Sequence, residues 1–298
     1  GVHAGAPALA TKLAARLGAT AVTLPEAVEA CVAGPSALGR ELNSKMLDGS
    51  ALGSDDVVRA LALRLGAPDC LSKGWVLLGA EDETLARGML AAGLQPHRVF
   101  VATLPDAAAE EKAATSSAAA AVRAGTPTVD VAALSTAEIA ARRSATPAVL
   151  SYFGERGLVV PLDGSKNGWA MYDAAEAETR HVITIHQRYA AAVATGGAAA
   201  IGELGVTADE FAAKLGGFGT YCPVTWKRER RLAKSGSGTD ARAALEDAAE
   251  LRGKCYAMAG PAQLAAFLAR PTEVLAGSVL PTALPRPVPT DEAATEGA

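Results

Sequence analysis

Hydrophobic and polar positions alternate between two kinds of pattern along the first half of the chain. Apolar residues recur at helical spacing in segments near residues 7–17, 36–47, 54–65, 83–93, 105–122 and 136–155. Short apolar runs lie between them, at residues 75–79, 98–102, 127–132 and 157–162. Helices that alternate with buried strands are typical of a parallel sheet covered on both faces. The pattern therefore predicts an α/β fold over residues 1–165, with the 75–79 strand central and next to the 98–102 strand.

A longer helical pattern follows and closes the first domain. It covers residues 171–195 and ends at two glycines, and we expect this helix to pack back on the α/β core. The first domain is therefore expected to span residues 1–200. Residues 202–207 predict a hinge, and Thr207 with Glu210 forms a capping-box pattern that predicts the start of a new helix.

The remainder of the chain predicts a small second module. Residues 205–276 are expected to fold as α+β, and residues 277–298 have the proline-rich composition of a linker. The module holds a large share of the chain's few aromatic side chains, namely Tyr221, Trp226, Tyr256 and Phe267. Aromatic side chains are common anchors of protein contacts. We therefore expect the module and the helical face of residues 170–194 to form a docking surface, with Trp226 as the best candidate for an outward contact.

Composition excludes several classes of function. A net charge of −4 gives no electrostatic reason to expect nucleic-acid binding. No run of eighteen apolar residues occurs and no secretory leader opens the chain, so we expect no membrane span. The four cysteines and four histidines are scattered, without a Cys-x-x-Cys pair. We expect reduced thiols in the cytosol and no metal site.

The first residues have the rhythm of a phosphate-binding loop that runs into a helix. Such loops use backbone N–H groups, a lysine and a Ser/Thr hydroxyl to hold phosphates and magnesium. If Gly5 is the last glycine of the loop, Ala6 stands at the lysine position and Pro7 at the Ser/Thr position. Proline also removes one backbone N–H. Lys12 lies too far into the helix to substitute, so the loop is predicted to be degenerate.

A series of short motifs downstream resembles the adenylate kinase family. The matching segments are residues 42–49 (Leu-Asn-Ser-Lys-Met-Leu-Asp-Gly), 55–58 (Asp-Asp-Val-Val), 64–65 (Arg-Leu), 69–70 (Asp-Cys) and 74–79 (Gly-Trp-Val-Leu-Leu-Gly). The resemblance extends to about residue 165 and implies a P-loop nucleotide-kinase-like sheet. It also implies that a buried first strand precedes Gly1, so we expect this sequence to be a fragment of a larger protein.

The same resemblance implies that the chemistry of the family is missing. In adenylate kinases the strand ends in Asp-Gly-Phe-Pro-Arg, which supplies a magnesium-site carboxylate and a phosphate-binding arginine. The corresponding positions run from Leu78 to Asp82. The family's late helix arginine corresponds to Ala137, with Arg142 and Arg143 out of register. We therefore expect no catalytic residues and no cofactor; the alternative is an active nucleoside monophosphate kinase that transfers phosphate from ATP to AMP.

The second module resembles the YHS family. The matching segments are residues 221–224 (Tyr-Cys-Pro-Val), 253–256 (Gly-Lys-Cys-Tyr) and 267–271 (Phe-Leu-Ala-Arg-Pro). Metal-binding relatives carry a second cysteine where this chain has Ala259, and Cys255 falls inside the strand motif. A lone thiolate at Cys222 is a poor zinc site. The resemblance therefore implies a metal-free packing module.

Together the two modules resemble a repeat unit of the long ciliary proteins that contain several adenylate-kinase-like domains, including those of the axonemal central apparatus. This implies a scaffold within a large hetero-assembly, whose partners are other axonemal proteins, with tubulin as a candidate. The implied location is the cytoplasm and cytoskeleton, in the axoneme of a cilium or flagellum. The basic run at residues 227–231 is interpreted either as a contact for an acidic surface or as a solvated loop.

Overall fold

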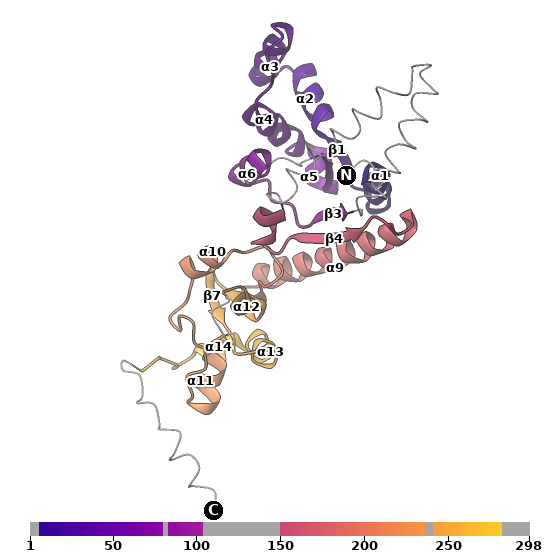
Figure 1. The fold of residues 1–298 in the computed structure, drawn as a ribbon. Helices are drawn as coiled ribbons and strands as arrows, with labels where there is room; N and C mark the ends of the chain where they lie inside the picture. The colour runs from indigo at the N-terminus through magenta and orange to yellow at the C-terminus, as the bar shows by residue number, and fades with distance from the viewer. Residues whose placement is uncertain (1–5, 80–82, 104–149, 236–240, 282–298) are drawn as a thin grey trace, which may run out of the picture. The chain divides into compact units, whose positions relative to one another are not determined.

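The computed structural model describes residues 6–79, 83–103, 150–235 and 241–281. The chain divides into two compact units, residues 1–185 and residues 186–298. Figure 1 shows the elements of each unit along the chain. The sequence interpretations of residues 105–122, 127–132, most of 136–155 and most of the proline-rich linker concern residues outside the described ranges.

The first unit combines helices with short parallel strands, as the α/β interpretation requires. Its helices are α1 (Ala6–Leu17), α2 (Leu24–Ala33), α3 (Ala37–Leu47), α4 (Ser54–Leu65), α5 (Pro68–Lys73), α6 (Glu83–Ala91) and the larger part of α9 (Gly168–Ala194). Its strands are β1 (Thr20–Thr23), β2 (Trp75–Leu78), β3 (Val99–Thr103) and β4 (Val159–Asp163). Residues 150–154 are also helical.

The strands pair in two parallel ladders. β1 pairs with β2 from Thr20↔Trp75 onward, and β3 pairs with β4 from Val99↔Val159 onward. The expected neighbours, the 75–79 and 98–102 strands, are not joined by a ladder among the described residues. That prediction was wrong about the neighbour, and β1, the strand that does pair with β2, was not anticipated. Its four residues, two of them threonines, give too short an apolar run to be recognised.

Hydrophobic clusters hold these elements in place, and three of them involve the strands or the helices that pack on them. In the largest, Leu61 and Leu65 of α4 and Met89 of α6 lie against β1 and β2. A second cluster joins Leu9 of α1 to Leu162 of β4, together with Tyr172 and Ala175 of α9. A third contains Ala86, Phe153 and Leu158, with Val99 and Val159 beside them. The N-terminal part of α9 therefore packs on the α/β core, as expected.

The second unit is a small α+β structure. Its elements are the end of α9, β5 (Ala199–Ala200), α10 (Ala208–Ala213), α11 (Pro223–Glu229), α12 (Ala241–Glu246), β6 (Ala248–Leu251), β7 (Lys254–Ala257), α13 (Pro261–Ala269) and α14 (Pro271–Leu275). The strands form an antiparallel sheet in the order β5-β6-β7. Arg252 and Gly253, both at positive φ, form the two-residue turn between β6 and β7, as a hairpin of this twist requires.

The division between the units falls inside α9, earlier than the boundary expected near residue 200. Tyr189 of α9 accounts for this, because it packs with Ile201 and Phe211 and its hydroxyl donates to Glu250 of β6 at 2.8 Å. Thr207 caps α10 through the expected box with Glu210.

The structure does not support a hinge at Gly202, the first residue of the hinge that was expected over residues 202–207. Ile201 is 1% exposed, and a Cβ at Gly202 would lie 2.8 Å from the carbonyl oxygens of Leu245 and Glu246. Gly202 therefore allows two backbone segments to approach each other closely, which is a packing role and not that of a hinge.

Candidate functional site

The start of α1 contains the two positions that the sequence assigns to a degenerate phosphate loop. Ala6 and Pro7 are the first two residues of this helix, whereas Gly5 lies outside the described residues. The carbonyl of Pro7 accepts a 3.0 Å hydrogen bond from the hydroxyl of Thr11. Ala6 offers a methyl group and Pro7 has no N–H, so neither residue supplies a side-chain contact to a phosphate.

Both cations of α1 are directed at α9. The Nζ atom of Lys12 lies 4.6 Å from the centre of the Trp169 ring, which is a cation–π contact. One turn later, Nε of Arg16 donates to Oε1 of Glu176 at 3.2 Å. In a functional phosphate-binding loop, this part of the chain would bring a lysine to the phosphate. Here both cations of the helix contact α9 instead.

The last residues of β2 and β4 are an apolar side chain and a locally bonded carboxylate. β2 ends at Leu78, a partly buried apolar side chain followed by Gly79; Asp82 lies outside the described residues. β4 brings Asp163 to the corresponding end, opposite Thr103. The hydroxyl and the N–H of Ser165 both donate to Oδ1 of Asp163, and this side-chain hydrogen bond lowers the pKa of Asp163. Asp163 thus closes a local turn.

Every described arginine of the first unit has a partner within the chain. Six pair with carboxylates: Arg16 and Arg180 with Glu176, Arg59 with Glu41, Arg64 with Asp69, Arg87 with Glu83 and Arg98 with Glu178. The other two donate to neutral oxygens: Arg40 to the carbonyl of Pro35 and Arg156 to the side chain of Gln95. Each of these guanidiniums therefore already has a hydrogen-bond acceptor within the chain.

These ion pairs shift the pKa values of carboxylates that take part in them. The hydrogen bond from Arg64 lowers the pKa of Asp69, and that from Lys45 lowers the pKa of Asp56. The most buried guanidinium is that of Arg98, whose side chain is 7% exposed and lies 2.7 Å from Glu178. Sequence spacing could have found Arg87 with Glu83 and Arg180 with Glu176, which are four residues apart on a helix. It could not have found Arg98 with Glu178, 80 positions apart.

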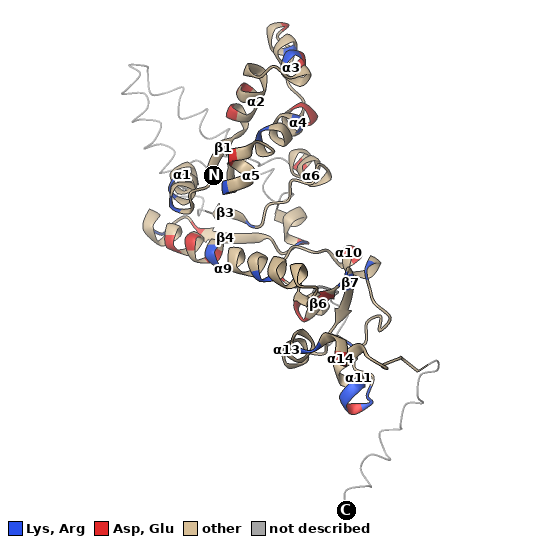
Figure 2. Ribbon diagram, turned by 180° about the vertical axis from the view of Figure 1, so that it is seen from behind, with Lys and Arg blue, Asp and Glu red and all other residues tan. Residues whose placement is uncertain are grey.

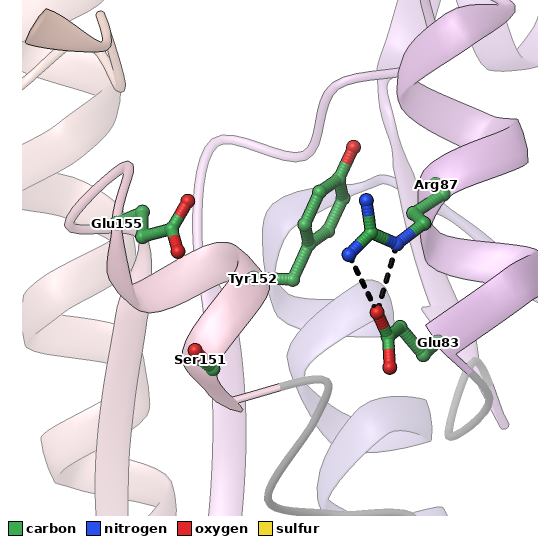
Figure 3. Close-up of a pocket in the computed structure, with 5 residues that line it drawn as sticks. All are labelled: Glu83, Arg87, Ser151, Tyr152 and Glu155. Atoms are coloured by element: carbon green, nitrogen blue, oxygen red, sulfur yellow. Dashed lines mark hydrogen bonds and ion pairs between the residues drawn. The ribbon is translucent and has the colours of Figure 1, made fainter.

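The first unit also has a pocket of about 220 Å³ between α6 and the helical residues 150–154. Its lining consists of Glu83, Arg87, Ser151, Tyr152 and Glu155 (Figure 3). The figure shows the Arg87 guanidinium bound to Glu83 and placed against the Tyr152 ring, whose centre is 4.7 Å away. The pocket's cation is thus satisfied by its neighbours, and the lining contains no histidine, lysine or cysteine.

In the second unit the positions that resemble a metal site serve in packing. Cys222 is fully buried and precedes α11, where its sulfur accepts a 3.5 Å contact from the N–H of Thr225. Cys255 lies in β7, as expected, and burial raises the pKa of its thiol. Ala259 is exposed. Within the described residues, no three His, Cys, Asp or Glu side chains gather as they would to hold a metal ion.

Within the same ranges, none of the helices combines the length and apolarity needed to cross a bilayer. This includes α9, the longest described helix at 27 residues, which carries charged side chains along its length.

Comparison with known proteins gives a partial likeness to a curated protein. No protein-family model matches the chain. It is 31% identical over 133 residues to adenylate kinase 9 of Mus musculus, an alignment that covers 44% of this chain and 6% of the mouse protein. The chain therefore spans only a small part of the length of this relative. The likeness supports an adenylate-kinase-like module, and the helices and small parallel sheets of the first unit are compatible with such a fold.

Proposed function

We propose that this chain is a catalytically inactive adenylate-kinase-like module with an appended small unit, and that it serves as a docking scaffold. The single observation that carries the proposal is the internal pairing of the first unit's described arginines and of Lys12. Lys12 and Arg16 contact α9, and the other described arginines bind carboxylates, a carbonyl or an amide of the same chain.

The pairing of these side chains matters because of what phosphoryl transfer requires. Catalysis of this reaction consists almost entirely of positioning and of neutralising the charge on the transferring group. Losing a single such electrostatic contact costs about 3 kcal/mol, or a factor of 10² to 10³ in rate. A module with Ala6 and Pro7 at the start of α1 and Leu78 at the end of β2 lacks several of these contacts at once.

The scaffold role is proposed to be exercised in the axoneme of a motile cilium, within the central apparatus. This part rests on the combination of the kinase-like motifs with those at residues 221–224 and 253–256, which resembles the long multi-repeat ciliary proteins. The partners would be other axonemal proteins, with tubulin as a candidate. The YHS-like character of the second unit belongs to the same proposal.

An active nucleoside monophosphate kinase is the second candidate, because the aligned mouse protein is named an adenylate kinase. The two candidates differ in a direct assay. We expect the purified chain to show no magnesium-dependent conversion of ADP to ATP and AMP, and no rise in melting temperature with ADP and magnesium. As a matched control, Lys12→Met should leave both results unchanged, since Lys12 contacts Trp169. Turnover that persists through purification and falls in Lys12→Met would favour the enzyme.

The docking role has its own test. The tagged chain, expressed in cells with motile cilia, should remain with the axoneme after detergent extraction of the membrane and matrix. A chain that is extracted completely, while a known axonemal component stays behind, would contradict the scaffold proposal.

A further inference from the structure

The basic run at residues 227–231 is not a solvated loop over its whole length, because its first three residues belong to α11. The helix buries Pro223, Val224 and Thr225 and turns the following residues outward. Figure 2 shows α11 as a largely blue, that is basic, element of the second unit. Residues 227–234 contain five basic side chains and one acidic one. The end of α11 and the residues directly after it therefore concentrate positive charge.

Two side chains of α11 hold the chain segment that follows α14. The indole N–H of Trp226 donates to the carbonyl of Val279 at 3.0 Å, and Nζ of Lys227 donates to the carbonyl of Ala276 at 2.7 Å. Ser278, which lies between them, is 9% exposed and bonds back to Val274. The segment is thus fixed beside α11, with the side chain of Val279 78% exposed.

The remaining cations are only weakly compensated. Arg228 is exposed and has no partner among the described residues. Arg230 lies over the Trp226 ring at 5.6 Å, and Arg231 pairs with Glu229, with both side chains largely exposed. Lys227 donates to a carbonyl oxygen, which is uncharged and leaves the positive charge of Lys227 without a counter-ion. Such clustered like charges repel one another, and an anionic partner would relieve this repulsion.

The backbone at Arg230 supports a role for its side chain. Arg230 adopts a left-handed conformation, with φ of 55°, at the end of α11. Glycine is the usual residue at this position because a Cβ is unfavourable there. An arginine at such a place is not explained by backbone preference. Its guanidinium instead covers Trp226, so the exposed indole face carries positive charge.

We propose that the surface formed by Trp226, Arg228, Arg230, Arg231 and Val279, the α11 surface, binds an acidic segment of a partner protein. The proposal rests on the proposed docking function and names the chemistry of the partner. Carboxylates of the segment would pair with the three guanidiniums, and an apolar side chain would pack against Val279 and the indole edge. Trp, Arg and an apolar neighbour are the composition typical of interface anchors. Single-stranded nucleic acid fits less well, because stacking of bases needs an open ring face and Arg230 occupies that of Trp226.

The test uses the full chain and a labelled synthetic peptide of glutamates with one phenylalanine, followed by fluorescence anisotropy at low and physiological salt. We expect saturable binding that weakens with salt and that is absent for the same peptide with glutamine in place of glutamate. A labelled thymidine oligonucleotide is measured in parallel. Equal or tighter binding of the oligonucleotide would overturn the assignment to an acidic protein segment.

Variants locate the binding. The double substitution Arg228→Glu and Arg230→Glu should weaken peptide binding by about tenfold or more, since two charge-assisted contacts become repulsive. The double substitution Arg188→Glu and Lys254→Glu, at two exposed positions of the same unit, brings the same change of net charge; it is the matched control and should change binding by less than about twofold. Equal losses in both variants would overturn the proposal, because the effect would then be one of net charge.

Arg230→Gly separates binding from folding. Glycine fits the left-handed backbone at residue 230, so the melting temperature of this variant should stay constant or rise. Its affinity for the glutamate peptide should fall about threefold or more, since one guanidinium is lost. Unchanged affinity would contradict the proposal. Failure of the peptide to bind while the chain still remains with the axoneme would refute only the α11 surface, and not the scaffold function.

Discussion

The two units of the chain use their basic side chains in opposite ways. In the first unit the described arginines pair with partners inside the unit, and Arg98 is the extreme case, with a side chain 7% exposed against Glu178. In the second unit Lys227 of α11 donates only to a carbonyl, and Arg228 is exposed and has no partner among the described residues. Internal pairing contributes to stability, whereas exposed, crowded charge contributes to recognition. The comparison therefore predicts which charges can be removed without harm to the fold.

Removing Arg98 should have the largest effect. Arg98→Met leaves Glu178 partly buried without its partner, so we expect the first unit to lose about 3 kcal/mol of unfolding free energy. The measurement is urea denaturation in a Trp226→Phe background, in which Trp75 and Trp169 report on the first unit.

Arg87→Met is the control for this prediction, because the Arg87 side chain is 61% exposed in its pair with Glu83. It should cost less than about 1 kcal/mol. Adding Glu178→Met to Arg98→Met should recover much of the loss, since replacing both members of such a pair with apolar groups is often nearly neutral. Equal costs for Arg98→Met and Arg87→Met would contradict the view that burial makes the difference.

In the second unit, the stability should depend on the phenol of Tyr189, which is uncharged at neutral pH. Tyr189→Phe removes the hydrogen bond to Glu250 and should cost about 1 kcal/mol at neutral pH. Burial also raises the pKa of Tyr189 from 10.0 to about 12. Because the folded-state pKa is the higher one, this stabilisation is present below pH 10 and is lost as the pH rises toward 12.

Trp226 fluorescence, with the other two tryptophans replaced by phenylalanine, measures the alkaline unfolding of the second unit. The wild-type chain should lose stability over this range more steeply than Tyr189→Phe. Identical alkaline profiles for the two proteins would show that Tyr189 does not carry the effect.

Lowering the pH should have opposite effects on stability at two carboxylates, Asp56 in the first unit and Asp247 in the second. The hydrogen bond from Lys45 lowers the pKa of Asp56 below 3.8, so its contribution is present above that value and is lost as the pH falls through the lowered pKa. Burial, with a smaller effect from Glu246, raises the pKa of Asp247. The stabilising form of Asp247 is therefore the neutral one, which is fully present below pH 3.8 and is lost as the pH rises through the raised value.

The corresponding substitutions should therefore differ in direction at neutral pH. Asp56→Asn is expected to destabilise the first unit, and Asp247→Asn to leave the second unit as stable or slightly more so. Melting temperatures at neutral and acidic pH, with the same tryptophan backgrounds, check both. A loss of stability at neutral pH in Asp247→Asn would refute the assignment of its charge as unfavourable.

The smallest change is expected at the exposed cation. Arg228→Ala should alter the unfolding free energy by less than about 0.5 kcal/mol, since the side chain has no internal partner among the described residues. Differential scanning calorimetry of the full chain is sufficient to measure this. A loss as large as that of Arg98→Met would remove the distinction between the two units.

Sequence reasoning recovered most of the longer helices of the first unit, but it missed α2, which has ten residues, and the short elements. The helices near residues 7–17, 36–47 and 54–65 have enough turns for an apolar stripe to show, and their bounds lie close to those of α1, α3 and α4. β1 has four residues and α5 has six, which is too few for either periodicity to be distinguished. The missed β1 is the strand that pairs with β2.

The candidate site could be predicted only at positions where the type of residue alone determines what its side chain can do. Ala6, Pro7 and Leu78 can be interpreted from the sequence, because no arrangement gives these side chains a charge. The arginines cannot be interpreted in this way, since their role depends on which carboxylate lies beside them. Arg16 and Glu176 are 160 positions apart, and only the packing of α1 on α9 brings them together.

The inward pairing of the first unit's arginines also determines what the unit can sense. A protein that holds its phosphate-binding cations open is stabilised by nucleotide in proportion to the logarithm of its concentration, once binding approaches saturation. A protein whose guanidiniums already bind Glu41, Asp69 and Glu178 carries its counter-ions within its own chain. In the inactive scaffold that we propose, the stability that these pairs give would not depend on whether the cell is rich or poor in ATP. Such a part would keep its rigidity through changes in the energy supply of its surroundings.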